Sequence, residues 1–367
     1  MKTAHLLFSL NPGGIESFVL QLTDALPSGV ETHVLTFFDG PLRARFEACG
    51  ATVHLLGSLS RPASLLHLYS TLRRVRPDVL NCHVTVAAGA AVFACKLLHI
   101  PFILYSHTTR PLTFSPRSLH ANVEKVSYVL ANRFKNLGIG VSRKACTAFG
   151  KQAGRCRLVN LGLDFSRFRP NATVREELMR RWDIPEGVQV VANVAGYRFQ
   201  KNYPFFLDVA ACVVRQKKNV RFLLIGEGRE REALEQKIGT LGLGPYCTLT
   251  GFVDNVPELL TNVVDVLLFP SLFEGLGLGL VEAQAAGVRC VYSDVVPPEA
   301  VVNPDLVRAL SLARPAEEWA DAVLQQLAEA ASHPTDRNKA LCVAQQSSFN
   351  LKNVVNQYME IWKQLAR

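Results

Sequence analysis

Short β-branched and apolar runs alternate with helical segments along this chain, and the alternation occurs twice. Strands that alternate with helices of about 10–15 residues predict right-handed crossovers and parallel sheets covered on both faces. The expected strands are Ala4–Leu10, Glu31–Phe37, Ala51–Leu56, Val79–Cys82, Phe102–Tyr105, Ile139–Val141 and Arg157–Val159 in the first half, and Gln189–Val194, Arg221–Ile225, Thr248–Thr250, Val266–Phe269 and Cys290–Tyr292 in the second. Three closing helices are expected near Glu317–Ala331, Asn338–Gln346 and Leu351–Leu365.

This pattern predicts an α/β protein with two doubly wound, Rossmann-like domains that face each other across a cleft. A length of 367 residues is enough for two such domains. Pro170 and Asn171 interrupt the pattern, so we expect a first domain over residues 1–168 and a second over residues 169–345. The last segment, residues 346–367, is an amphipathic helix expected to pack back on the first domain.

The composition excludes several classes of protein. With 49% apolar and 19% charged residues, the chain is not disordered, collagen-like or a coiled coil. No apolar run reaches the roughly 18 residues that span a bilayer, and the start does not resemble a signal peptide. The nine cysteines form no Cys-x-x-Cys pair, and most lie in apolar stretches. We therefore expect reduced, buried cysteines, no zinc site and a cytoplasmic protein.

The net charge of +9 is unevenly distributed. Residues 1–170 hold 20 basic and 8 acidic residues, whereas residues 171–367 hold 20 and 23. Nucleic acid, an anionic membrane surface or a phosphorylated small molecule could each attract the basic half, and a solvated basic surface explains it equally well.

The most specific motif runs from Ser271 to Ala283, directly after an apolar strand. Its three closely spaced glycines disfavour a helix interior and predict a turn leading into a helix. The N–H groups of such a turn suit a diphosphate or a sugar hydroxyl. Glu274 and Glu282 border this turn, and because carboxylates repel phosphate, we expect them to accept from hydroxyl groups.

Other candidate residues follow strands. The turn at Gly13–Gly14 could approach a phosphate, and Glu16 is either a ligand-binding acid or a plain first-turn acid. His107 ends a strand at the expected ligand-binding edge. Lys201 is expected to open a helix and to neutralise a diphosphate.

These motifs together resemble the retaining GT-B glycosyltransferases of the family 4 type (glycosyl transferases group 1). Glu274 and Glu282 look like the family's Glu-x7-Glu signature, and the resemblance covers nearly the whole chain. The other matching segments are Gly13–Glu16, Asn160–Asp164, Phe168–Pro170, Gln200–Asn202, Leu224–Gly228, Thr250–Val253 and Glu282–Gly287. The family usually has an arginine where this chain has Gly196. Either Arg198 replaces it, or Lys201 works with another group.

The resemblance implies an enzyme that moves a sugar from a nucleotide diphosphate to a hydroxyl acceptor with retention of configuration. Glu274, Lys201 and His107 would be catalytic. The donor-binding residues would be Gly13, Gly14, Arg198, Lys201, Gly226, Phe252, Val253, Glu274, Gly275, Leu276, Gly277, Leu278 and Glu282. The co-substrate would be a UDP- or GDP-sugar. No cofactor or metal is expected, because the chain has no Asp-x-Asp pair to hold a metal ion.

The acceptor implied by the resemblance is a glycan or lipid-linked glycan in cell-surface polysaccharide synthesis, reached from the cytoplasm at the inner face of the membrane. Arg110, Arg117, Arg143 and Lys144 could meet an anionic acceptor or simply be solvated. A nucleotide-sugar 2-epimerase of the same fold is the main alternative. A nucleic-acid-binding protein is disfavoured by the absence of a recognisable binding motif. A dinucleotide-dependent oxidoreductase is rejected because the glycine spacing is wrong.

Overall fold

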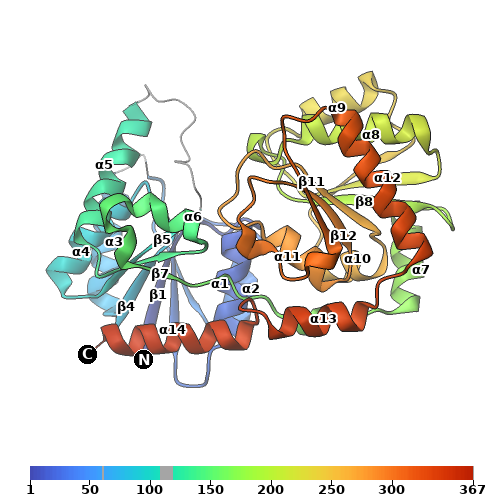
Figure 1. Cartoon of the computed structure of the whole chain (residues 1–367). Helices are drawn as coiled ribbons and strands as arrows, with labels where there is room; N and C mark the ends of the chain where they lie inside the picture. Colours follow the sequence, from blue (N-terminus) through green and yellow to red (C-terminus); the bar gives the residue numbers. More distant parts are fainter. Residues whose placement is uncertain (60–61, 108–118, 367) are drawn as a thin grey trace. The chain divides into compact units, whose positions relative to one another are not determined.

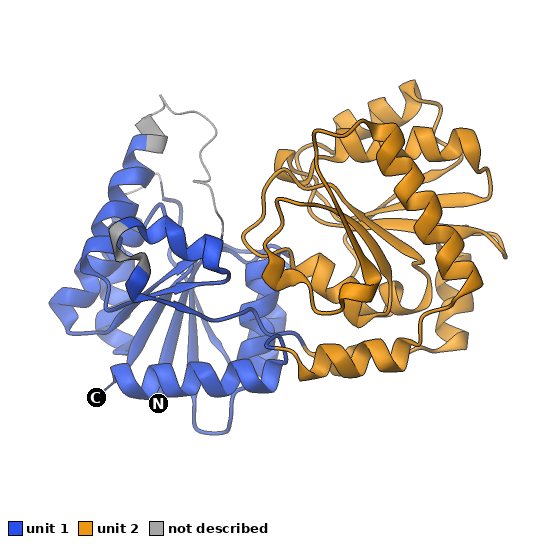
Figure 2. Ribbon diagram, in the orientation of Figure 1, with its two compact units in different colours: residues 1–163, 348–367 blue, residues 164–347 orange. Residues whose placement is uncertain are grey.

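The computed structural model describes residues 1–59, 62–107 and 119–366, and it divides into two compact units (Figure 2). The first unit comprises residues 1–163 and 348–367, and the second comprises residues 164–347. The chain therefore leaves the first unit five residues earlier than the sequence predicts, and it returns two residues later than predicted. Arg110 and Arg117 lie outside the described residues.

The first unit is built on a seven-stranded parallel sheet in the order β3-β2-β1-β4-β5-β6-β7 (Figure 1). The strands are β1 Lys2–Ser9, β2 Glu31–Phe38, β3 Thr52–Leu55, β4 Val79–Cys82, β5 Phe102–Ser106, β6 Leu137–Gly140 and β7 Cys156–Leu158. The α-helices are α1 Gly14–Asp24, α2 Arg43–Ala48, α3 Pro62–Val75, α4 Ala88–Leu98, α5 Leu119–Phe134, α6 Arg143–Cys146 and α14 Leu351–Leu365. Two-sided helical cover explains why every residue of the central strands β4 and β5 is buried.

The second unit has a six-stranded parallel sheet in the order β10-β9-β8-β11-β12-β13. Its strands are β8 Gln189–Val194, β9 Val220–Ile225, β10 Cys247–Gly251, β11 Val266–Phe269, β12 Arg289–Ser293 and β13 Val307–Leu310. Its α-helices are α7 Ala172–Arg181, α8 Tyr203–Gln216, α9 Arg231–Thr240, α10 Val256–Asn262, α11 Leu278–Ala285, α12 Ala316–Ser332 and α13 Arg337–Gln346. Sequence reasoning missed β13, because this short edge strand exposes Arg308 and Ala309 and carries little apolar signal.

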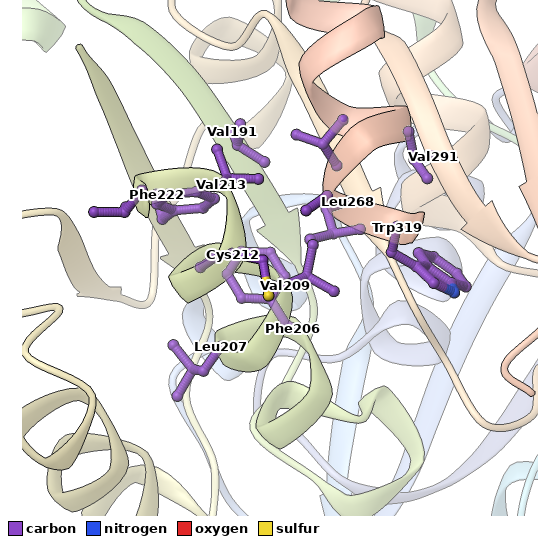
Figure 3. Close-up of a cluster of buried hydrophobic side chains, with 14 of the residues drawn as sticks. Val191, Phe206, Leu207, Val209, Cys212, Val213, Phe222, Leu268, Val291 and Trp319 are labelled. Atoms are coloured by element: carbon purple, nitrogen blue, oxygen red, sulfur yellow. The ribbon is translucent and has the colours of Figure 1, made fainter. Parts of the chain in front are cut away.

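The core of the second unit fixes α8 against the sheet. Phe206, Val209 and Val213 of α8 pack on strand residues such as Phe222 and Leu268, and Trp319 of α12 joins the same cluster (Figure 3). Each of these six side chains is fully buried. The loop that connects β8 to α8 is therefore held at both ends by rigid elements.

The last helix completes the first unit. Val354, Tyr358 and Trp362 form the buried face of α14, and the Trp362 indole Nε1 donates to Asn81 Oδ1 of β4 at 3.0 Å. Leu163 and Asn350 form a parallel bridge that ties the returning chain to the first unit. Trp362 lies 281 positions after Asn81 in the sequence, and α14 thus helps to close the core of the first unit.

The cysteine prediction was wrong in part. Cys146 at the end of α6 and Cys156 at the start of β7 form a disulfide, because the intervening turn brings their Cα atoms to 5.8 Å. Cys342 is exposed, and Cys49 and Cys247 are only partly buried. The four buried free cysteines, Cys82, Cys95, Cys212 and Cys290, behave as small apolar residues.

Replacement of Trp362 by alanine should destabilise the first unit. The change leaves a cavity in the core and removes a buried hydrogen bond to Asn81, so we expect a loss of about 3–5 kcal/mol in the free energy of unfolding. Urea denaturation measures it, and the exposed Lys363→Ala exchange on the same helix is the control. A Trp362→Ala protein as stable as the control would contradict the packing of α14.

Candidate functional site

The strand order determines where a ligand-binding site can lie on each sheet. Chain connections in the second unit run outward in opposite directions from β8 and β11, which are neighbours. Ligands of doubly wound sheets bind beyond the carboxyl ends of strands at such a switch point. Lys201 follows β8 and Glu274 follows β11, so the two predicted catalytic residues of this unit flank its switch point.

The structure brings Lys201 and Glu274 into direct contact. The Lys201 Nζ lies 2.5 Å from Glu274 Oε1, and the two side chains are 18% and 6% exposed. The Nζ also lies 5.1 Å from the centre of the Phe269 ring. Because two desolvated charges are stable together only when they are paired, each residue fixes the other in place.

Sequence reasoning assigned no role to Gln200. Its Nε2 donates to Glu274 Oε2 at 3.2 Å and to the Phe273 carbonyl at 2.9 Å. Glu274 is therefore oriented by an amide on one oxygen and by an ammonium on the other. Lys201 does not open a helix as expected. It closes the short 3-10 helix η3 Phe199–Lys201, and Asn202 then turns through a left-handed conformation (φ 53°) into α8.

The glycine-rich motif forms the predicted turn before α11. Gly277 precedes the helix with a φ of 96°, a left-handed conformation that strongly favours glycine. Gly279 lies inside the first turn, where a Cβ would stand 3.1 Å from the Val194 carbonyl oxygen at the end of β8. Gly275 and Leu276 are buried, and Leu278 begins the helix. Close packing of α11 on β8 thus favours glycine at position 279, because a Cβ there would make a tight contact with the β8 backbone.

Glu282 lies on α11, one turn after the glycine-rich segment. Burial raises the pKa of its carboxyl group to about 7, and Arg167 partly offsets this increase in pKa. A desolvated carboxyl of this kind is stabilised in its charged form by hydroxyl donors. The geometry is compatible with the predicted contact to ribose hydroxyls.

The remaining donor-binding candidates of this unit follow β8, β9 and β10. A Cβ at Gly196 would stand 3.4 Å from Arg198 Nε, so the guanidinium of Arg198 lies against the position of the missing family arginine. Gly226 has a φ of 146°, and a Cβ there would collide with the Ala195 carbonyl. Phe252 is exposed, and Val253 is partly buried.

The switch point of the first sheet lies between β1 and β4, and residues near it form a chain of imidazoles. His5 Nδ1 and His83 Nε2 are 3.1 Å apart, and His83 Nδ1 and His107 Nε2 are 2.9 Å apart. Burial lowers the pKa of His5 and of His107 to about 3 and holds that of His83 well below its usual value. All three rings are therefore neutral near pH 7, and sequence reasoning found only His107.

Neutral imidazoles in such a chain must share one tautomer. If His5 Nδ1 donates, then His83 and His107 also carry their protons on Nδ1; if His107 Nε2 donates, all three carry them on Nε2. His107 Nδ1 is buried and has no hydrogen-bond partner among the described residues. This nitrogen is the end of the row of three imidazoles at which a substrate hydroxyl could bind.

The turn at Gly13–Gly14 follows β1. Gly13 is the cap of α1, and a Cβ there would collide with Glu16 Oε2, so the side chain of Glu16 folds back over this turn. Helix α1 begins at Gly14, as a phosphate-binding turn requires.

Within the described parts of the chain, no group of three or more His, Cys, Asp or Glu residues is arranged to hold a metal ion. No described helix is long and apolar enough to cross a bilayer.

Comparison with known proteins places both units in one class of enzyme. Residues 12–167 match the family model described as Glycosyltransferase Family 4, and residues 174–340 match Glycosyl transferases group 1. The putative glycosyltransferase EpsF of Bacillus subtilis is 25% identical over 91% of this chain and 89% of its own. A 2-deoxystreptamine N-acetyl-D-glucosaminyltransferase of Streptomyces fradiae is 27% identical over 75% of this chain and 73% of its own.

Two solved structures share the fold. Anabaena Alr3699/HepE, crystallised with UDP and glucose, superposes with a TM-score of 0.86 at 20% identity and covers 99% of both chains. WaaG, a glycosyltransferase involved in lipopolysaccharide biosynthesis, has a TM-score of 0.79 at 14% identity over 98% of this chain and 99% of its own. The two-domain α/β architecture predicted from sequence is that of GT-B glycosyltransferases.

Glu282→Gln should remove a pH dependence of stability. The unfolded carboxyl ionises near pH 4.5 and the folded one near pH 7, so the free energy of unfolding falls as pH rises through this interval. The glutamine does not ionise. As pH rises from 4.5 to 7, we therefore expect the free energy of unfolding of the variant to increase relative to that of the wild type by on the order of 3 kcal/mol. Urea denaturation at both pH values checks it, with the exposed Glu186→Gln as control.

The histidine chain predicts a spectroscopic result. The ¹⁵N shifts of His5, His83 and His107 near pH 7 should report the same single tautomer in all three rings. His83→Phe should break the coupling and allow His107 to mix tautomers. Opposite tautomers in neighbouring rings of the wild type would show that the two hydrogen bonds do not form.

Proposed function

The chain belongs to the glycosyltransferases of the group 1 and family 4 type, and on this basis we propose that it transfers a sugar from a UDP-sugar to a hydroxyl acceptor with retention of configuration. The observation that carries the proposal is the Lys201–Glu274 pair beside the glycine-rich turn at the switch point of the second sheet. The UDP and UDP-glucose complexes of the Anabaena structure favour UDP over GDP as the nucleotide.

The ion pair suggests how the donor is recognised. A diphosphate attracts Lys201 away from Glu274, and the carboxylate that is released can accept hydrogen bonds from the sugar hydroxyls. A ligand with both groups therefore replaces both halves of the pair, whereas a free phosphate or a free sugar replaces only one. The amides of Gly275 to Leu278 would hold the diphosphate, and Glu282 would hold the ribose.

We propose that the transfer breaks and forms the following bonds. The bond between the anomeric carbon and the β-phosphate oxygen breaks, and its electron pair stays on that oxygen. The acceptor oxygen bonds to the same face of the sugar, and its proton passes to the departing phosphate. Lys201 and Arg198 would stabilise the charge that grows on the diphosphate, and His107 Nδ1 would contact the transferred sugar.

The proposed acceptor is a glycan or lipid-linked glycan of a cell-surface polysaccharide, and the proposed location is the cytoplasmic face of the membrane. WaaG, a glycosyltransferase involved in lipopolysaccharide biosynthesis that shares the fold of this chain, favours a cell-surface acceptor. The alternative, a nucleotide-sugar 2-epimerase, would convert the donor without an acceptor. Incubation of the protein with UDP-sugars alone, followed by product analysis, separates the two reactions.

Lys201→Ala and Glu274→Gln should each lower kcat by about 10²–10³, because both residues act on the charge or the hydroxyls of the reacting donor. Release of UDP from UDP-glucose and similar donors measures the rate, and the melting temperature checks folding. Lys237→Ala removes a more exposed ion pair, with Asp208, elsewhere in the same unit and should retain activity. Full activity of both site variants would contradict the assignment.

A further inference from the structure

The disulfide between Cys146 and Cys156 stands apart from the other cysteines of the chain. All nine cysteines lie within the described residues, and the other seven remain thiols, including the exposed Cys342. Proteins that keep their cysteines as thiols are typical of reducing compartments, where a disulfide is usually transient or redox-sensing. Both residues of this pair are partly exposed, so the bond lies where a small thiol can approach it. A single accessible bond among seven thiols indicates a reversible pairing.

The segment between the two cysteines is anchored without the bond. It is the 3-10 segment η1 Thr147–Arg155. The Phe149 side chain is buried, and its carbonyl accepts from Asn132 Nδ2 at 3.2 Å. The Ala148 carbonyl accepts from the Tyr128 hydroxyl at 3.1 Å. Because both donors lie on α5, we expect this segment to keep its place when the disulfide opens.

Helix α6, in contrast, is held by the bond at its last residue. The helix is a single turn that contacts β6 and β7 (Figure 1). The amides of Ala145 and Cys146 donate to the Ser142 side chain and carbonyl, each at 3.0 Å. A Cβ at Gly140 would stand 2.5 Å from Cys146 Sγ, so this sulfur lies against the end of β6. Since one helical turn is unstable on its own, the covalent bond to β7 contributes to its order.

Cations surround the bond. From residue 125 to residue 163 the chain has eight basic residues and no acidic one. Arg155 and Arg157 flank Cys156, and both are exposed. Burial and the nearby charge of Arg155 lower the pKa of the Lys135 ammonium to about 8. Positive charge stabilises the thiolates that attack and leave in thiol–disulfide exchange, and it attracts anionic thiols such as glutathione.

We propose that Cys146 and Cys156 form a redox switch that exchanges with glutathione and whose opening releases the end of α6. The thiolate of one glutathione bonds to a protein sulfur, the S–S bond breaks, and the departing cysteine takes up the proton that glutathione lost. A second glutathione attacks the mixed disulfide in the same way. The protein gains two thiols, and the two glutathione molecules are oxidised to their disulfide. Oxidised glutathione reverses both steps.

The released helix carries Arg143 and Lys144, which are both exposed. The sequence makes these two cations candidate contacts of an anionic acceptor. Opening of the bond would loosen them and so weaken the binding of such an acceptor. This consequence rests on the proposed function, whereas the exchange with glutathione does not.

Glutathione buffers test the exchange. The full-length protein is equilibrated with mixtures of reduced and oxidised glutathione, its thiols are alkylated, and mass spectrometry measures the disulfide fraction. Without denaturant, this fraction should fall from near one to near zero across the mixtures and recover when oxidised glutathione is added. Arg155→Glu should slow the reduction roughly three- to fivefold at low salt and less at high salt. The matched control Arg180→Glu, at an exposed position on α7 of the second unit, should not slow it.

Amide hydrogen exchange tests the release of α6. Reduction should speed exchange at Ala145 and Cys146 roughly tenfold, because their hydrogen bonds then open locally, and it should leave the amides of β4 unchanged. Cys146→Ser should show the fast exchange in every buffer, and Cys342→Ser should behave as the wild type does. If Cys146→Ser does not fold, the chemically reduced wild type supplies the comparison.

Three results would overturn the proposal. They are a bond that resists reduced glutathione in the folded protein, loss of cooperative unfolding on reduction, and unchanged hydrogen exchange in α6. Failure of the wild type to bind UDP-glucose in either redox state would instead count against the proposed function alone.

Discussion

The contact between Lys201 and Glu274 depends on the order of the strands. The two residues are 73 positions apart and meet because β8 and β11 are neighbouring parallel strands whose carboxyl ends lie at one edge. Around that edge, α8 is anchored by a buried apolar cluster, and α11 approaches β8 so closely that a Cβ at position 279 would contact the Val194 carbonyl at 3.1 Å. The sheet therefore supplies the geometry in which a buried ion pair is tolerable.

A neutral pair is a suitable resting state for a site that binds an anion with attached hydroxyls. An unpaired lysine at 18% exposure would attract any phosphate, and an unpaired carboxylate at 6% exposure would be strongly desolvated. Pairing satisfies both groups, and it makes binding unfavourable for a ligand that can replace only one of them, because the other charge would then be left buried without a partner. If the site binds the proposed donor, selectivity for the complete donor would follow from the requirement that both partners be exchanged together.

The sequence predicted the architecture well because β/α alternation is local and strongly periodic. Lys201, Glu274 and His107 were predicted as site residues from their places after strands and from the family resemblance; the structure brings Lys201 and Glu274 into contact, and the catalytic roles of all three stay predictions. Their contacts could not be predicted, because the partner of each side chain depends on strand order and on rotamers. His5 and His83 were missed because each is a single histidine within or just after an apolar strand. The Cys146–Cys156 disulfide was missed for a similar reason, since odd cysteine counts and apolar surroundings carry no information on which pair lies within reach.

The two units differ in how the chain builds them. The second unit is continuous, so all its strands and helices are available once residue 347 has been synthesised. The first unit is discontinuous, and its β4 residue Asn81 accepts hydrogen bonds from both Tyr105 of β5 and Trp362 of α14. Trp362 also packs edge-on against His5, the inner end of the imidazole chain. The surroundings of the imidazole chain therefore depend on the docking of α14, a helix that lies far from these residues in the sequence.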